Sequence, residues 1–350
     1  MGKIAAAAFS ILFVAGAHHG AQAQDAKQDA IAQFYKGKTI TVIVGTSAGG
    51  GYDTYARTFA RFMGRHLAGA PTIIVANMPG AGSNIMATNV AVTAPKDGTV
   101  IGAPFSTQPL SGILEDASRL RYDPVKLNYL GSATTDYFLC VANPSAPAKT
   151  FPETFKTEIV MGGTAETGST GYLPVMLNNV LGTKFKPVFG YPGSREIMTA
   201  IEKGELHGMC GINLASIKSQ YSNLMSENKI HIIVQESANG VEELNKLGIP
   251  RTMDFAKTDE QRAIMDIIYS QEIYARPYFV APETPKDRVE ALRTAFMDTW
   301  KDPELLAEMK RMSLDVDPTS GEDLQKLLAK VYASPPDIIA KTKEAIKIKR

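Results

Sequence analysis

The chain has 350 residues, with 37 Lys and Arg against 36 Asp and Glu, so its formal net charge of +1 is close to neutral. This balance argues against nucleic acid as the partner, because proteins that bind nucleic acids carry an excess of basic residues. Hydrophobic residues make up 44% of the chain, which suffices for ordinary packed cores and excludes disorder. The length favours about two domains.

The first residues have the pattern of a secretory signal peptide. Lys3 is followed by an apolar run from Ile4 to Ala17 and then by Ala21-Gln22-Ala23, the small-x-small sequence that signal peptidase cleaves. We therefore expect residues 1–23 to be removed and the mature chain to lie in the periplasm, with an uncleaved signal anchor as the alternative. The run is shorter than the roughly 20 residues of a membrane-spanning helix, and no later run is as long, which excludes a membrane-spanning protein.

Short apolar runs then alternate with amphipathic stretches, a pattern typical of an α/β fold in which helices cover parallel strands. In the first part of the chain, buried strands are predicted at 39–44, 72–76 and 99–103. Between the first two, apolar residues recur at helical spacing and predict a helix with one buried face: Tyr55, Phe59, Phe62, Met63 and Leu67.

A second series of elements predicts a second α/β lobe. Its strands are expected at 137–141, 158–161, 186–189, 206–211 and 230–234, with helices opening near Ser169, Ser194 and Leu214.

The last part of the chain predicts a return to the first lobe. Residues 275–277 lead into a strand at 278–280, and prolines stop that strand before a helix over 286–300. Further helices are expected from Pro303 and Gly321 onward. We therefore expect lobe 1 at 30–134 plus 275–350 and lobe 2 at 135–274. Because no Pro/Gly/Ser linker separates them, crossing strands would join the lobes around a cleft that closes by hinge motion.

The most informative segment is the glycine loop Gly45–Asp53, which follows a predicted strand and precedes a helix. Successive glycines let backbone N–H groups approach a ligand, and the helix adds its positive dipole end, so the loop predicts a main-chain seat for an anion. The spacing matches neither the Walker nor the G-x-G-x-x-G pattern of phosphate-binding loops. Asp53 is a candidate ligand contact, and the alternative is a structural role as the N-cap of the helix.

Two further loops repeat this arrangement. The turn Asn77–Asn84 lies between a strand and a helix, where Ser83 or Asn84 could cap the helix; it either lines the cleft or simply turns the chain. In the second lobe, Gly162–Thr170 gives strand, polar loop and helix N-terminus in the same order. Glu166 is discordant there, because an ionised carboxylate would repel a bound anion.

Residues that could carry a reaction or hold a metal show no recognisable pattern. His66, His207 and His231 are not paired at ligand spacing, and no G-x-S-x-G nucleophile motif occurs, so we expect neither an enzyme nor a metal site nor a cofactor. Cys140 and Cys210 lie in apolar, strand-like runs. We interpret them as buried, unpaired side chains, with a disulfide as the alternative in an oxidising compartment.

Several motifs together resemble the periplasmic substrate-binding receptors of tripartite tricarboxylate transporters. The resemblance covers nearly the whole mature chain and follows the family's order in its motifs: the exported leader, Ala48-Gly49-Gly50-Gly51-Tyr52-Asp53, Asn77-Met78-Pro79-Gly80-Ala81-Gly82-Ser83-Asn84, Ala94-Pro95-Lys96-Asp97-Gly98-Thr99-Val100, Gly190-Tyr191-Pro192-Gly193 and Ala281-Pro282-Glu283-Thr284-Pro285.

The resemblance implies a type II periplasmic binding protein fold and a ligand carboxylate held by main-chain N–H groups and ordered waters from a loop of each lobe. Carried over by position, the family's contacts fall on Ser47–Gly51, on Thr164 with Gly168–Thr170, and on Tyr191. The full set of candidate ligand-binding residues adds four more and reads Ser47, Ala48, Gly49, Gly50, Gly51, Asp53, Asn84, Thr107, Thr164, Gly168, Ser169, Thr170, Tyr191 and Asn213.

The function expected from the resemblance is a receptor that captures a small carboxylate, such as a di- or tricarboxylate, and delivers it to the membrane permease subunits of the transporter. We expect it to act as a monomer. A co-receptor that presents its ligand to a sensor kinase is the alternative, and a secreted enzyme on a related scaffold is a third possibility. Gly45-Thr46-Ser47, Glu166 and Pro192 depart from the family's usual residues, so the family name does not fix the ligand.

Overall fold

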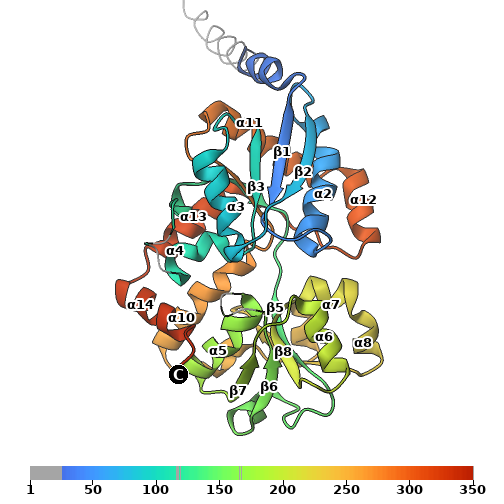
Figure 1. Ribbon diagram of the computed structural model, residues 1–350, viewed down its shortest axis with the longest axis vertical. Coiled ribbons are helices and arrows are strands. Elements are labelled where there is room, and N and C mark those ends of the chain that lie inside the picture. The colour runs from blue at the N-terminus through green and yellow to red at the C-terminus, as the bar shows by residue number, and fades with distance from the viewer. Residues whose placement is uncertain (1–25, 116–117, 119, 165, 167, 350) are drawn as a thin grey trace, which may run out of the picture.

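The computed structural model describes residues 26–349 except 116–117, 119, 165 and 167, so the predicted signal peptide lies outside the described residues. Figure 1 shows two α/β lobes, one above the other, each built around its own sheet. Within the described part of the chain, no helix combines the length and the apolar character needed to cross a bilayer.

The sheet of lobe 1 has six strands in the order β11-β4-β10-β3-β1-β2. Strand β1 (Thr39–Val44) pairs in parallel with the edge strand β2 (Thr72–Asn77) and with β3 (Val100–Ala103). On the other side of β3, strand β10 (Pro277–Val280) runs antiparallel to both β3 and β4 (Asn128–Ser132), and β11 (Thr319–Ser320) closes the edge.

Alternation along β1 divides the core of lobe 1 into two layers. Ile40, Val42 and Val44 point to the layer with α2 (Gly51–Met63), α11 (Lys286–Thr299) and α12 (Pro303–Arg311), where the rings of Phe59 and Trp300 stack 5.6 Å apart. Ile43 points to the opposite layer, which contains α3 (Asn84–Thr88), α4 (Ser111–Leu114) and α13 (Gly321–Tyr332). Figure 1 shows α2 and α12 on one side of strands β1, β2 and β3, and α3, α4 and α13 on the other.

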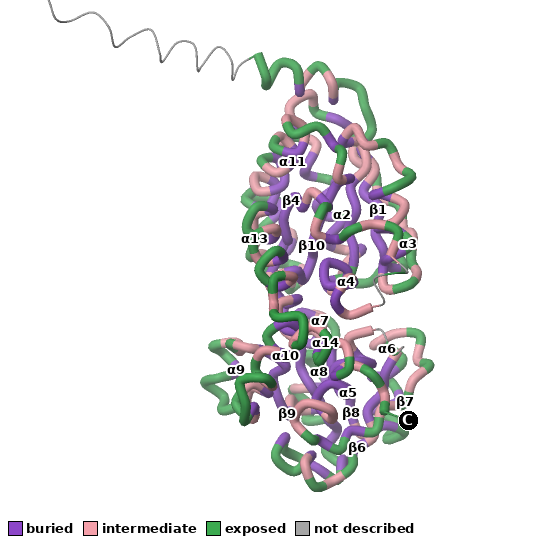
Figure 2. Tube along the Cα trace, turned by 90° about the vertical axis from the view of Figure 1, so that its left-hand side faces the viewer, coloured by how far each residue is buried: buried purple, intermediate pink, exposed green. Residues whose placement is uncertain are grey.

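The sheet of lobe 2 has five strands in the order β7-β6-β8-β5-β9 and repeats the pattern of lobe 1. Strand β6 (Ile159–Gly162) pairs in parallel with β7 (Phe185–Val188) and β8 (Gly208–Asn213), and β5 (Phe138–Ala142) runs antiparallel to β8 and β9 (His231–Glu236). Figure 2 shows buried residues along the strands of each lobe.

Helices again cover both faces of the second sheet. One layer contains α5 (Ser169–Leu181) and α10 (Asp259–Tyr269), and the other contains α6 (Ser194–Glu202), α7 (Leu214–Gln220), α8 (Ser222–Ser226) and α9 (Glu242–Lys246). The last helix, α14 (Pro336–Ala345), packs against lobe 2, where Asn179 Nδ2 donates to the carbonyl oxygens of Ala345 and Lys347 at 2.9 Å.

In each sheet, an antiparallel strand follows a crossing between the lobes: β10 in lobe 1 and β5 in lobe 2. The segment between β4 and β5 leads into lobe 2, and the segment before β10 leads back. The two crossing segments lie side by side, because Ala133 N donates to Arg276 O at 3.0 Å and Asp136 N donates to Glu272 O at 3.1 Å. Two α/β lobes joined by crossing strands confirm the predicted type II periplasmic binding protein fold.

Candidate functional site

Every candidate ligand-binding residue lies at or just beyond the carboxyl end of a parallel strand. In lobe 1, Ser47–Gly51 and Asp53 follow β1, Asn84 follows β2 and Thr107 follows β3. In lobe 2, Thr164 and Gly168–Thr170 follow β6, Tyr191 follows β7, and Asn213 ends β8. Because β1 and β6 each lie between the next two parallel strands of their sheet, each set surrounds a topological switch point, where open α/β sheets bind their ligands.

The glycine loop of lobe 1 places backbone at the surface. Residues 47–50 are exposed, and Gly49 has a φ of +85°, a conformation that favours glycine. Gly50 is the N-cap of α2, and its carbonyl accepts the N–H of Thr54 at 2.9 Å. The N–H groups of the first turn of α2 have no partner within the helix, so they point toward the loop as donors.

Asp53 braces this loop from the first turn of α2. Its carboxylate accepts hydrogen bonds from the N–H of Gly49 (2.8 Å), from Asn77 Nδ2 (2.9 Å) and from Arg57 Nε (2.8 Å). Burial opposes its ionisation, but these three donors hold the pKa of Asp53 below its ordinary value. The prediction that Asp53 is the N-cap is wrong, because Gly50 holds that position and Asp53 lies three residues further on.

Ser83 ties the three loops of lobe 1 together. Its hydroxyl donates to the carbonyl oxygen of Gly45 after β1 (3.0 Å) and accepts the N–H of Phe105 after β3 (2.9 Å), while Ser83 itself lies after β2. Ser83 is fully buried and is the N-cap of α3, but its side chain makes no capping bond. The sequence indicated a cap at this position, whereas the structure shows a link between loops.

Asn84 faces a neighbouring carboxylate. Its Nδ2 donates to both oxygens of Glu115, at 2.8 and 2.9 Å, and its Oδ1 accepts the hydroxyl of Tyr122. Burial raises the pKa of Glu115, and the bond from Asn84 opposes that shift. Asn84 is therefore occupied by protein groups in this structure.

The loop of lobe 2 ends at α5 in the same way. Gly168 is the N-cap of α5, and its carbonyl accepts the N–H groups of Gly171 and Tyr172 at 2.8 and 3.0 Å. The hydroxyl of Thr170 accepts the N–H of Thr164 at 3.1 Å, which folds the loop back onto the helix. Ser169 Oγ donates to the carbonyl oxygen of Gly211 at 3.0 Å, which fixes the helix end against β8.

Tyr191 and Asn213 lie on the two strands that flank β6. The N–H of Tyr191 donates to Gly163 O at 3.4 Å, and its partly buried ring packs against the core layer beneath α6 and α7. Asn213 pairs with Phe138 across β8 and β5 and is the N-cap of α7.

Groups from the two lobes meet between these loops. Burial is the main reason why the pKa of Tyr172, in the first turn of α5, is raised, and the nearby Tyr52 of α2 adds a smaller contribution in the same direction. A cavity of about 360 Å³ lies beside Tyr172. Its lining comes from lobe 1, lobe 2 and the C-terminal residues: Thr107, Leu114, Glu115, Glu166, Tyr172, Lys343, Ile346, Lys347 and Ile348.

The crossing segments contribute an ion pair that the sequence did not indicate as part of the site. Arg276 Nη2 lies 3.3 Å from Asp136 Oδ2, and both side chains are 4% exposed. The guanidinium of Arg276 also lies over the ring of Tyr52, at 4.3 Å from its centroid. A charged residue within the apolar run that leads into β10 was the available signal, because a buried charge requires a partner.

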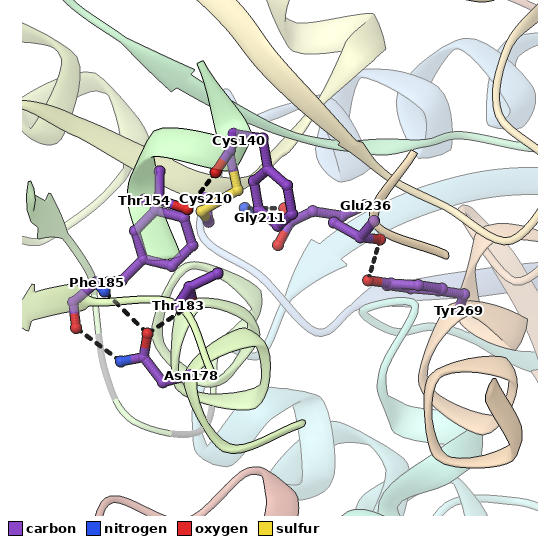
Figure 3. The surroundings of a disulfide bond; sticks show 11 residues. Cys140, Thr154, Asn178, Thr183, Phe185, Cys210, Gly211, Glu236 and Tyr269 are labelled. Atoms are coloured by element: carbon purple, nitrogen blue, oxygen red, sulfur yellow. Dashed lines mark hydrogen bonds between the residues drawn. A yellow bond between two sulfur atoms is a disulfide. The ribbon is translucent and has the colours of Figure 1, made fainter. Parts of the chain in front are cut away.

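Cys140 and Cys210 form a disulfide, so the interpretation of unpaired thiols is wrong. The cysteines lie on the neighbouring antiparallel strands β5 and β8, near an irregularity in their register, and this non-local pairing brings the two sulfurs together. Figure 3 shows the bond beside Gly211 and Glu236. Among the described residues, Cys140, Cys210 and Glu236 are the group whose side-chain atoms lie close enough together to hold a metal ion. Because both sulfurs are in the disulfide, neither cysteine can offer a thiolate to a metal.

Two α/β lobes, each with a helix N-terminus after a glycine-containing loop at its switch point, have the architecture of a two-lobed solute-binding protein. The family model described as "Tripartite tricarboxylate transporter family receptor" matches residues 55–343, and the chain belongs to this family.

Solved structures with the same fold include a TctC solute-binding protein from Polaromonas, 17% identical with a TM-score of 0.63, and MatC from Rhodopseudomonas palustris with bound malate, 18% identical with a TM-score of 0.63. Each comparison covers 89% of this chain and 99% of the other. The periplasmic binding protein BugD is 21% identical, with a TM-score of 0.64 over 89% of this chain and 98% of its own.

A curated relative from Agrobacterium vitis, described as a UPF0065 protein in the TAR-I ttuE-ttuC′ intergenic region, is 29% identical over 197 residues. The match covers 54% of this chain and 53% of that relative, so it spans about half of the relative's length.

Proposed function

We propose that the protein is a periplasmic receptor that captures a small carboxylate and delivers it to the membrane subunits of a tripartite tricarboxylate-type transporter. One observation carries the proposal: the N-termini of α2 and α5 follow glycine-containing loops at the carboxyl ends of β1 and β6, one in each lobe. Both ends offer backbone N–H donors and a positive dipole to an anion.

The candidate residues would bind the ligand from both lobes. Ser47–Gly51 would donate main-chain N–H groups from lobe 1, and Thr164 with Gly168–Thr170 would do so from lobe 2. Asp53 would act by holding the loop, because Gly49, Asn77 and Arg57 already occupy its carboxylate. Closure of the lobes would exclude water and strengthen each N–H···O bond.

Two observations support a carboxylate as the ligand. The seat consists of N–H groups, which match carboxylate oxygens, and the family is one of transporter receptors. Structures of the same fold were solved with malate, in MatC, and with adipate, in a second Rhodopseudomonas palustris protein that is 18% identical with a TM-score of 0.63. We infer a receptor that releases its ligand unchanged and acts as a monomer.

The disulfide supports location in the periplasm. Disulfides persist in oxidising compartments and are uncommon in the cytosol, and the bond between Cys140 and Cys210 is buried within the sheet of lobe 2. The apolar leader at residues 4–17 points to the same compartment.

A thermal-shift screen of refolded, ligand-stripped protein tests the proposal. The panel contains mono-, di- and tricarboxylates, amino acids and aromatic acids, and an acid at 100 times its Kd should add about 2.7 kcal/mol to the free energy of unfolding. A shift for one or a few acids is expected. If no carboxylate stabilises the protein, the receptor proposal is wrong.

A substitution at Gly50 locates the site. A Cβ at this position meets no atom within 4 Å, and φ is −85°, so the Gly50→Leu variant should fold while its side chain obstructs the loop. The matched control is Thr93→Leu, an exposed position at the end of the π-helix Asn89–Thr93, in the segment that leads to the amino end of β3. If the acid no longer raises the thermal midpoint of Gly50→Leu but still raises that of Thr93→Leu, the carboxylate binds at the N-terminus of α2.

A further inference from the structure

A buried arginine at the hinge has a donor that the fold does not use. Arg276 is 4% exposed and lies on the crossing segment that leads back into lobe 1. Its Nη1 donates to Ala275 O at 2.7 Å, and its Nη2 faces Asp136 Oδ2 at 3.3 Å. Its Nε is buried and has no hydrogen-bond partner in the described part of the chain. An unpaired, charged donor of this kind is costly to bury.

The same guanidinium lies against the first turn of α2. Its Cζ is 4.3 Å from the centroid of the Tyr52 ring and 5.0 Å from that of Tyr55. A Cβ added to Gly51 would lie 3.4 Å from Arg276 Nη2. Gly51 and Tyr52 are the first two residues of α2, so the arginine lies beside the N–H groups of the lobe 1 seat.

Two positive elements therefore lie together at the lobe 1 seat. The N-terminus of α2 carries roughly half a positive charge, and Arg276 adds a full one. Asp136, whose Oδ2 lies 3.3 Å from Arg276 Nη2, offsets part of this charge, and its Oδ1 accepts the N–H groups of Tyr137 (2.9 Å) and Ala215 (3.2 Å). Main-chain N–H groups alone can hold an anion without any cation, so the buried arginine requires a separate explanation.

We propose that Arg276 is a specificity-determining residue, whose charge beside Gly51 makes the lobe 1 seat select ligands with an ionised carboxylate over uncharged ligands of the same shape. The inference rests on the proposed function and names its ligand class: organic acids that place a carboxylate on the N-terminus of α2. The interaction acts over a few ångströms in a partly buried site, where the effective dielectric constant is well below that of water.

Titration calorimetry with succinate, malate, adipate and their diamides tests the inference. In the intact protein, we expect an acid to bind more tightly than its diamide. Arg276→Met removes the charge and keeps most of the stem, so the ratio of the two affinities should fall about tenfold or more. Arg276→Lys keeps the charge and should retain most of the ratio. Asp136→Asn removes the opposing negative charge and should raise the ratio above that of the intact protein.

The variants separate a charge effect from a structural one. If Arg276 only braced the hinge, all three substitutions would weaken the acid and the diamide by the same factor, which would overturn the inference. Circular dichroism checks the fold, and if Arg276→Met does not fold, Asp136→Asn decides: a higher ratio supports the inference and an equal or lower one overturns it. If the intact protein binds none of the acids, the inference fails together with the proposed function.

Discussion

Glu236 Oε2 accepts the backbone N–H of Gly211 at 2.6 Å, directly beside the disulfide (Figure 3). Gly211, with φ of +72°, lies so close to the N-terminus of α5 that an added Cβ would come within 2.5 Å of the Ser169 backbone. The Gly211 carbonyl in turn accepts Ser169 Oγ at 3.0 Å. Glu236 and the disulfide therefore fix the strand residue against which the lobe 2 seat is built.

The first prediction concerns pH. Burial raises the pKa of Glu236 to about 8 from its ordinary value of 4.5, and the bond from Gly211 opposes this shift. The folded protein thus holds a proton that the unfolded chain loses near pH 4.5. This contribution to stability is fully present below about pH 4.5 and is lost as the pH rises through about 8, with a slope of up to about 1.4 kcal/mol per pH unit.

Glu236→Gln should therefore show a flatter decline of the free energy of unfolding with pH, measured by urea denaturation between about pH 5 and about pH 9. Glu272→Gln is the comparison, because burial also raises the pKa of Glu272 to about 8, so each variant should remove part of the slope. The exposed variant Glu283→Gln is the control and should keep the full slope. Parallel curves for Glu236→Gln and the intact protein would show that Glu236 is ionised in the fold.

The second prediction concerns the disulfide. The cysteines are 70 residues apart, and a cross-link that closes a loop of this size stabilises a protein by about 2–4 kcal/mol. Reduction of the intact protein should lower its free energy of unfolding by this amount. The double variant Cys140→Ala/Cys210→Ala should show a similar loss and no further response to a reducing agent. A thermal midpoint of the intact protein that reduction leaves unchanged would mean that the bond contributes little.

The third prediction concerns the brace of the glycine loop. Asp53→Ala removes the acceptor for Gly49 N–H and Asn77 Nδ2, two part-buried hydrogen bonds that each contribute about 0.5–1.5 kcal/mol to stability. Carboxylate binding should weaken as well, because the loop loses its fixed geometry. Arg57→Met removes only the exposed partner of the same carboxylate and should cost less than about 1 kcal/mol. Urea denaturation and ligand titration of both variants check this order, and equal losses would contradict it.

Local periodicity predicted most of the fold. The strand predicted at 39–44 matches β1, and the helix predicted from Lys286 matches α11 to within one residue at its end. Strand β4 was not predicted, since Asn128-Tyr129-Leu130-Gly131-Ser132 has neither a long apolar run nor a clean alternation. Helix α10 was not predicted either, although Thr258 and Gln261 form a capping box ahead of its apolar residues, a signal that could have found it.

The parts of the site that depend on non-local contacts could not be predicted from the residues. The loops after β1 and β6 were identified, because strand, glycines and helix are consecutive in the sequence. The pairing of Cys140 with Cys210 depends on the antiparallel register of β5 and β8, and the contact of Arg276 with Asp136 depends on two crossings between lobes. Neither follows from spacing along the chain. The individual ligand contacts and the lobe boundaries stay predictions.

The last prediction concerns the contact between Gly45 and Ser83. A Cβ at Gly45 would lie 2.4 Å from Ser83 Oγ and 2.5 Å from Ser83 Cβ, closer than real side chains approach. Gly45→Ala should therefore destabilise lobe 1 by about 1–3 kcal/mol through overpacking. Ser83→Gly should also cost stability, because it removes the bonds to Gly45 O and Phe105 N, although glycine suits the φ of +74° found at Ser83.

The double variant separates the two effects. With Ser83→Gly in place, the atoms that an alanine at position 45 would strike are gone, and the remaining neighbour is the flexible Met86 Cε at 3.2 Å. Gly45→Ala should then cost much less than it does alone, so the losses should be less than additive by about 0.5–3 kcal/mol in urea denaturation. Strictly additive losses would mean that Ser83 does not set the space at Gly45, and that the three loops of the lobe 1 seat are not coupled through its side chain.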